Sequence, residues 1–271
     1  MTLKEKLAQC HQQKKALFAF NFYNLETLKA VVMAASELKK DIILQLTKSS
    51  IEYMGLNTAV HLARTLLSEY NVKAWLHLDH SASVDLCKTC LKAGFDSVMI
   101  DASEKSFEDN IEMTRRVVEF ARPFNAHVEA ELGYVAKLGQ DFDKRVFTDP
   151  QDAKKFIDAT GIDALAVAIG SAHGFYKGTP KLELTLLEKI NTTVNIPLVL
   201  HGGSGIPDDQ IQQAVKKGIC KINVATEIKN MFMKSLQTIL AENEEIDLRK
   251  VFPPAIESVK DLIINKLRIL D

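Results

Sequence analysis

The chain has 271 residues, a length that suits one large domain or two small ones. Its formal net charge of −1, with 25% charged and 46% hydrophobic residues, excludes a general attraction to nucleic acid or to an anionic membrane surface. The segment 1–15 is charged and lacks the apolar core of a signal peptide, and no apolar run is long enough to span a membrane. The four cysteines do not form the pattern of a secreted disulfide framework, so we expect a cytoplasmic protein.

Short apolar, β-branched runs alternate with helical stretches along the chain. In the stretches 25–40 and 107–124, apolar residues recur at the helical spacing i, i+3, i+4 and i+7. Eight such units predict a single (β/α)8 TIM barrel domain over residues 1–271, with C-terminal helices over 241–270 packed onto it. A doubly wound open sheet is the alternative, but its usual glycine-rich first turn is absent from NFYNLET. The expected strands are 16–22, 42–46, 74–79, 97–102, 126–132, 164–169, 197–202 and 221–225.

Polar residues gather at the ends of the expected strands, whereas nothing comparable occurs at the strand beginnings. In a (β/α)8 barrel the chemistry takes place at the C-terminal rim of the strands. This asymmetry predicts an enzyme. In chain order the polar residues at this rim are Asn21, Thr47, Asp79, His80, Asp101, Glu129, Glu131, His173, His201 and Asn223.

Three of these rim residues are histidines, namely His80, His173 and His201. Neutral imidazoles bind zinc well, and a catalytic zinc site has three protein ligands and one open position. A hydrogen-bonded structural role is the alternative for a histidine at a strand end. Strand alternation places His77 and Asp79 on one face and His80 on the other. We therefore expect the strand to end near Asp79 and His80 to curl over the rim.

Two turns have the character of phosphate-binding loops. HGGSG (201–205) follows the seventh strand and NVATE (223–227) follows the eighth. Backbone N–H groups in such turns and at helix N-termini bind anions, and barrels commonly hold phosphate in these loops. Ser204 and Thr226 add hydroxyl donors. An ordinary tight turn is the alternative for HGGSG.

The carboxylates at the rim offer acid–base chemistry. Asp79, beside His80, is able to exchange a proton with a substrate hydroxyl. Glu129 and Glu131 point the same way from one strand, where they would either orient histidine ligands or form salt bridges at the rim. Lys221 is expected to begin its strand at the opposite rim, which disfavours a Schiff-base mechanism.

Longer motifs run in order between residues 16 and 230, namely AFNFYNLET, HLDHS, SVMIDAS, VEAELG, TGIDALAVAIGSAHGFYKG and PLVLHGGSGIPDDQIQQAVKKGICKINVATEIKN. In these motifs the chain resembles the class II, zinc-dependent ketose-bisphosphate aldolases of the tagatose-bisphosphate and fructose-bisphosphate type. The resemblance implies a lyase of carbohydrate metabolism, as in glycolysis. Such a lyase reversibly cleaves a ketose 1,6-bisphosphate to dihydroxyacetone phosphate and glyceraldehyde 3-phosphate.

The resemblance also implies the metal ligands. His80, His173 and His201 match the residues that bind Zn²⁺, and Asp101 and Glu131 match positions that hold the metal in an alternative, withdrawn position. The metal would polarise the substrate carbonyl as a Lewis acid.

Further roles follow from the same resemblance. Asp79 matches the residue that exchanges the proton of the C4 hydroxyl, and Asn223 the residue that steadies the enediolate. Backbone carbonyls around Gly174, Gly202 and Ser204 resemble a site for Na⁺ or K⁺, and the family forms homodimers or homotetramers. The residues implied in binding the substrate are Asn21, Ser49, Ser50, Gly174, Gly202, Gly203, Ser204, Asn223, Val224, Ala225, Thr226 and Lys229.

One segment departs from the pattern of the family. After VEAELG the family usually has a glycine pair and an acidic cluster, whose acid exchanges the C3 proton of dihydroxyacetone phosphate. Here the chain reads ELGYVAKLGQDFDKRVFTDP, and Asp141, or else Asp143, would supply that acid. The departure leaves two alternatives. One is the same chemistry on another ketose 1-phosphate with a different aldehyde half, and the other is a sugar-phosphate-binding paralogue without turnover.

Overall fold

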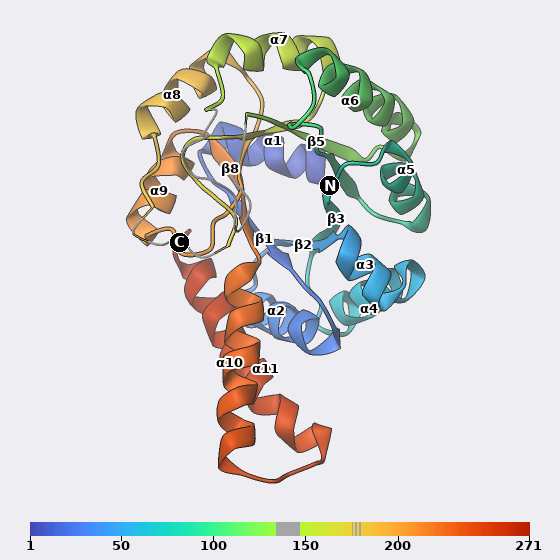
Figure 1. Ribbon diagram of the computed structural model, residues 1–271, viewed down its shortest axis with the longest axis vertical. Helices are drawn as coiled ribbons and strands as arrows, with labels where there is room; N and C mark the ends of the chain where they lie inside the picture. The colour runs from blue at the N-terminus through green and yellow to red at the C-terminus, as the bar shows by residue number, and fades with distance from the viewer. Residues whose placement is uncertain (134–146, 175, 177, 179) are drawn as a thin grey trace.

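A closed barrel of eight parallel strands forms the centre of the computed structural model, which describes residues 1–133, 147–174, 176, 178 and 180–271. Each strand pairs with the next along the chain, and β8 closes the barrel against β1 (Figure 1). The predicted TIM barrel is confirmed. The strands are β1 (Leu17–Asn21), β2 (Ile42–Thr47), β3 (Ala74–Ser81), β4 (Ser97–Ile100), β5 (His127–Leu132), β6 (Ala164–Val167), β7 (Leu198–Leu200) and β8 (Ile219–Val224).

Helices surround the barrel on its outer side (Figure 1). Several begin at a capping side chain: Ser106 accepts a hydrogen bond from the N–H of Asp109, and Asp149 caps a helix that has Pro150 in its first turn. Such caps define where each helix starts after its strand. The helices are α2 (Leu25–Leu38), α3 (Lys48–Met54), α4 (Leu56–Glu69), α5 (Val84–Ala93), α6 (Phe107–Ala121), α7 (Pro150–Thr160), α8 (Leu184–Thr193) and α9 (Asp208–Lys216), with the 3₁₀ turn η1 (Arg122–Phe124).

Helix α1 (Leu3–Gln13) covers the end of the barrel where the strands begin. Its Leu3 and Leu7 are buried in a cluster with Leu17 at the start of β1 and Trp75 at the start of β3. Full burial of a leucine side chain contributes about 1.5–3 kcal/mol. This end of the barrel is therefore closed by apolar packing.

The last two helices, α10 (Thr226–Glu242) and α11 (Leu248–Arg268), form a hairpin that projects from the barrel (Figure 1). The expectation of C-terminal helices packed onto the barrel holds for α11, which packs along α2. At the turn of the hairpin, Ile246 is 92% and Leu248 60% exposed. No helix in the described part of the chain is long and apolar enough to cross a membrane.

Strand β3 does not end near Asp79, so that prediction was wrong. The strand continues to Ser81, and its register with β4 shifts between Leu78 and Ser81. Within this bulge His80 has a left-handed backbone with φ of 47°. A bulge inserts one extra residue and thereby breaks the two-residue alternation. It is this bulge that lets Asp79 and His80 face the same centre.

The predicted position of Lys221 was also wrong. Strand β8 starts two residues earlier than predicted, because Ile219 already pairs with Leu198 of β7. Lys221 is therefore the third residue of the strand, and its side chain is fully buried. It lies on the same face of the strand as Asn223, two residues further on.

Candidate active site and metal centre

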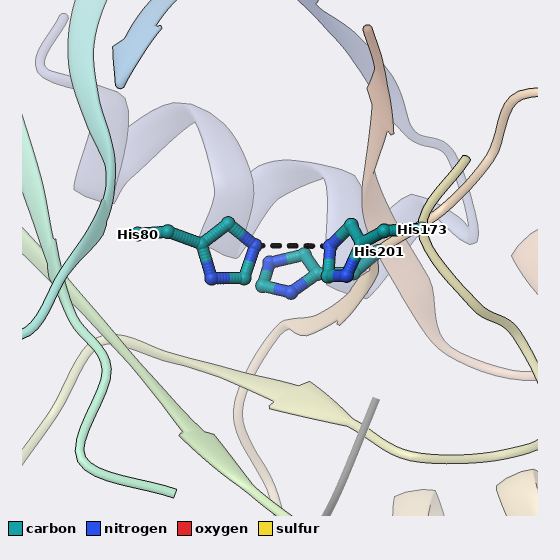
Figure 2. A group of neighbouring side chains, drawn as sticks. All are labelled: His80, His173 and His201. Atoms are coloured by element: carbon teal, nitrogen blue, oxygen red, sulfur yellow. Dashed lines mark hydrogen bonds between the residues drawn. The ribbon is translucent and has the colours of Figure 1, made fainter. Parts of the chain in front are cut away.

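The three rim histidines converge on one point (Figure 2). Nε2 of His80 lies 3.1 Å from Nε2 of His173, and the ring centres of His80 and His201 are 4.5 Å apart. One ring nitrogen from each lies within 4.8 Å of the others. Three nitrogens bound to one zinc ion at about 2.0–2.1 Å lie a little over 3 Å apart, and the His80 and His173 nitrogens already have this spacing. The donor set therefore fits a zinc ion with an open coordination position.

Asp101 orients the first of these histidines. Its Oδ2 lies 2.9 Å from Nδ1 of His80, and its Oδ1 accepts hydrogen bonds from the N–H and the hydroxyl of Ser103. Burial raises the pKa of Asp101, but the hydrogen bond and positive charge of His80, together with the hydrogen bonds from Ser103, outweigh burial and lower that pKa below its usual value. The ionised carboxylate keeps the hydrogen on Nδ1, which leaves Nε2 of His80 free for a metal. His80, Asp101 and Glu131 also form a second group of converging ligand atoms.

Two carboxylates hold the ring of His201. Its Nδ1 lies 2.7 Å from Oε2 of Glu131, and its Nε2 lies 3.0 Å from Oε1 of Glu129. Burial lowers the pKa of His201, but the hydrogen bonds to Glu129 and Glu131 and the negative charges of these two residues together outweigh burial and raise the pKa to about 10. Both glutamates thus orient the histidine, which was one of the two alternatives predicted for Glu129 and Glu131. Glu129 also forms the salt bridge of the other prediction, with Lys221 at 2.8 Å.

Asp79 is held between two amides. Asn21 donates to its Oδ2 at 2.9 Å and Asn223 to its Oδ1 at 3.2 Å, while Gln45 donates to Asn21 at 2.7 Å. Burial raises the pKa of Asp79, but nearby positive charge, chiefly on His80, outweighs burial and lowers the pKa below its usual value. Asp79 is therefore an ionised carboxylate next to the histidines, ready to accept a proton.

A cavity of about 690 Å³ opens over His80, His173 and Asp79. A smaller cavity of about 30 Å³ shares these three residues and adjoins the glycine-rich loops. Gly203 and Val224, which were also predicted to bind substrate, line neither cavity, and the side chain of Val224 is fully buried in the core. The other predicted substrate-binding residues line one or both cavities: Asn21, Ser49, Ser50, Gly174, Gly202, Ser204, Asn223, Ala225, Thr226 and Lys229.

The two predicted phosphate loops are tied to each other. The hydroxyl of Ser204 accepts hydrogen bonds from the N–H groups of Ala225 and Glu227 at 3.4 Å each. Gly202 has φ of +64°, and a Cβ there would lie 2.2 Å from the carbonyl oxygen of Ala172. Only glycine tolerates both the conformation and the close approach. The backbone at Gly202 therefore packs closely against that of Ala172 beside the smaller cavity.

Lys229, in the first turn of α10, lines the larger cavity. Its Nζ lies 5.3 Å from the centre of the Tyr23 ring, and the hydroxyl of Tyr23 donates to the carbonyl of Ala225 at 3.4 Å. Ser49 and Ser50 line the same cavity, and both hydroxyls lie near Oγ1 of Thr47, at 3.0 and 3.1 Å. Among the described residues, the larger cavity is thus lined by one lysine and several hydroxyls.

The sequence analysis did not single out Tyr23, Gln45 or Lys221 as site residues. Each carried a signal: Tyr23 directly follows the first strand, and Gln45 precedes the strand-end Thr47 by two residues. Lys221 precedes Asn223 by the same spacing, which places both on one face of β8. Asp141 and Asp143 lie outside the described residues.

A barrel with three converging histidines beside an aspartate is typical of metal-dependent enzymes. Comparison with protein families narrows this class, because the family described as "Fructose-bisphosphate aldolase class-II" matches residues 1–271. The chain therefore belongs to the class II fructose-bisphosphate aldolase family and is an aldehyde-lyase. This confirms the resemblance seen in the sequence.

Individual relatives and solved structures agree with this assignment. The chain is 42% identical to a fructose-bisphosphate aldolase of Geobacillus stearothermophilus and 39% identical to one of Staphylococcus epidermidis, in each case over 99% of this chain and 96% of the relative. The YdjI aldolase of Escherichia coli K12 is 29% identical, with a TM-score of 0.87 over 100% of this chain and 96% of that one. A putative fructose-1,6-bisphosphate aldolase of Coccidioides immitis is 26% identical, with a TM-score of 0.89 over 98% and 95%.

Proposed function

We propose that this protein is a zinc-dependent aldolase that reversibly cleaves a ketose 1,6-bisphosphate of the fructose or tagatose type to dihydroxyacetone phosphate and glyceraldehyde 3-phosphate. The convergence of His80, His173 and His201 beside Asp79, in a cavity large enough for a sugar phosphate, carries the proposal. The names of the relatives favour the fructose form.

In this proposal the three histidines hold the zinc ion, and Asp101 and Glu131 offer the alternative position. The bound ion supplies Lewis-acid polarisation of the ketose carbonyl. Asp79 accepts the proton of the C4 hydroxyl while the C3–C4 bond breaks, and it returns that proton in the aldol direction. Asn21 and Asn223 keep the two carboxylate oxygens of Asp79 aimed at the cavity, which limits the reorganisation that the proton transfer needs.

The two phosphates of the substrate are assigned to different cavities, the first of them to the smaller cavity beside the glycine-rich loops. Gly174, Gly202, Ser204 and Thr226, with the N-terminus of α10 (Thr226–Glu242), would bind the phosphate of the dihydroxyacetone half. The carbonyls of Gly174, Gly202 and Ser204 would bind Na⁺ or K⁺. The Gly202 carbonyl already accepts a hydrogen bond from the hydroxyl of Tyr176, and its second lone pair would serve the cation.

The second phosphate is assigned to the larger cavity. Lys229, Ser49 and Ser50 would bind it there. Asp141 would exchange the C3 proton of dihydroxyacetone phosphate.

One alternative keeps the same chemistry on another ketose 1-phosphate with a different aldehyde half. Among the described residues that line the larger cavity, Lys229 is the only lysine or arginine. A single lysine would suffice for a substrate that has no second phosphate, which favours this alternative.

Residues 1–271 are proposed to form a single domain, and the protein is proposed to assemble as a homodimer or homotetramer. The exposed apolar side chains of Leu240, Ile246 and Leu248 at the turn of the α10–α11 hairpin support this assembly. Light scattering coupled to gel filtration would measure it. A cytoplasmic location is proposed as well, because four free, buried cysteines suit a reducing compartment.

A coupled assay of dihydroxyacetone phosphate release, run over a panel of ketose phosphates and bisphosphates, tests the proposed reaction. EDTA should abolish turnover, and zinc or cobalt should restore it. Activity that survives both EDTA and His80→Ala would refute the metal mechanism. A preference for a ketose 1-phosphate with another aldehyde half would favour the first alternative. Calorimetric binding without C3 proton exchange would favour the non-catalytic paralogue.

A further inference from the structure

A buried lysine lies directly beneath the candidate metal centre. Nζ of Lys221 donates to Oε2 of Glu129 at 2.8 Å, and the other carboxylate oxygen of Glu129 lies 3.0 Å from Nε2 of His201. The side chains of all three residues are fully buried. Lys221 therefore reaches the histidine through a single carboxylate.

On its other side, Lys221 contacts a polar chain that leads away from the site. Its Nζ lies 3.3 Å from Nε2 of His77, whose Nδ1 lies 2.7 Å from Oγ of Ser97. That hydroxyl in turn lies 3.0 Å from Nδ1 of His127. Lys221 thus has two polar neighbours. Glu129 leads to the metal centre, whereas His77 leads to Ser97 and His127, although its Nε2 also lies 3.8 Å from Oε2 of Glu129.

The charges in this layer are costly to bury. The interior of a (β/α)8 barrel is normally filled by branched apolar side chains, and an apolar pair is often at least as stabilising as a buried ion pair. Stability alone therefore gives no reason for Lys221 and Glu129. What the pair provides is an ionised carboxylate in a fixed place, with one oxygen held by the lysine and the other directed at a ring nitrogen of His201.

We propose that Lys221 is a positioning residue of the metal centre. By holding Glu129 in place, it fixes the ring orientation of His201, and so directs Nδ1 toward the metal. Glu131, now 2.7 Å from that Nδ1, would give way to the ion or bind it. The inference rests on the proposed function, because it takes the three histidines as zinc ligands.

Zinc affinity, measured by competition with a chromogenic chelator, tests this proposal without any assay of turnover. Lys221→Met keeps the length of the side chain but removes its charge. Loss of such a supporting group weakens metal binding about 10–100-fold, and the same loss is expected here. The absorption spectrum of the cobalt-loaded variant should change as well, because the orientation of one ligand changes.

Ser97→Ala is the matched control. It removes the hydroxyl that contacts His77 and His127 and leaves the Lys221–Glu129 and Glu129–His201 contacts in place. Its zinc affinity should stay within about twofold of the wild type. A folded Lys221→Met protein with wild-type affinity and an unchanged cobalt spectrum overturns the proposal, and so does an equal loss in both variants.

A second pair of variants decides the matter if Lys221→Met does not fold. Glu129→Gln should itself lose about tenfold in zinc affinity. In that background Lys221→Met should change the affinity by less than about twofold, because the lysine acts only through the carboxylate. Wild-type affinity in Glu129→Gln, or a further tenfold loss on adding Lys221→Met, contradicts the proposal. His80→Ala distinguishes failure of this proposal from failure of the proposed function. If this variant binds zinc as tightly as the wild type, the three histidines are not the zinc site.

Discussion

The two ends of the barrel are built from the same strands but filled with opposite chemistry. Where β3 begins, Trp75 packs against Leu3 and Leu7 of α1; where it ends, Asp79 and His80 face the cavity. Side chains at the first end gain stability by leaving water, whereas those at the second are held by hydrogen bonds and charge. Stability and catalysis should therefore be separable along a single strand.

Asp79→Asn should produce the largest effect at the catalytic end. The amide is nearly isosteric but accepts no proton, so cleavage should fall about 10²–10⁴-fold. Steady-state kinetics would measure the loss, with zinc affinity as the control that should stay near the wild-type value. A variant that keeps more than a tenth of the activity would remove Asp79 from its proposed role.

Leu7→Ala should show the opposite profile at the closed end. Leu7 is fully buried, and a substitution of this type costs about 2–5 kcal/mol of unfolding free energy. Urea unfolding would measure it, while kcat of the folded fraction should not change. The matched control is Leu25→Ala, because Leu25 is 44% exposed, and its effect should stay within about 0.5 kcal/mol. A large fall in kcat for Leu7→Ala would show that the two ends are coupled.

Lys229→Met should affect substrate choice, with catalysis itself unchanged. Loss of one charge-assisted phosphate contact costs about 1.5–3 kcal/mol, or roughly 10–100-fold in kcat/KM for a bisphosphate. The value for a ketose 1-phosphate should hardly change. Kinetics with both substrates would measure the difference, and equal losses for the two would place the second phosphate elsewhere.

His127→Gln should have the smallest effect, a change in how stability depends on pH. Burial lowers the pKa of His127 below 6.5 in the folded protein. As pH falls through 6.5, the unfolded chain gains a proton that the folded chain does not, so stability is lost, at up to about 1.4 kcal/mol per pH unit. Urea unfolding of metal-free protein at pH 7 and pH 5.5 should show a shallower loss in the variant. An identical loss in both proteins would mean that His127 takes up a proton in the folded state.

Much of the site followed from where polar residues stand in the sequence. The barrel was predictable because each strand-plus-helix unit carries its own apolar periodicity. The convergence of His173 and His201 then followed from the parallel order of the strands, since every strand end lies on one rim. The tight turn at HGGSG was predictable from its glycines, because Gly202 has a backbone that other residues rarely adopt.

The details that the sequence did not predict are those set by pairing between strands. The bulge at His80 arises from the register between β3 and β4, and no local pattern shows it. The position of Lys221 inside the barrel depends on where β8 begins to pair with β7. A shift of one residue turns a side chain to the other face of a strand, so these positions are decided by neighbours distant in sequence.

By itself, then, the sequence determined the eight-unit barrel, the rim that carries the polar side chains and the identity of the three histidines. All of these depend on local periodicity and residue type. Only the tertiary structure decided how Asp79 and His80 share one centre, and that Glu129 stands between Lys221 and His201. These contacts join residues 72 to 92 positions apart, and the chain brings them together only when the barrel closes.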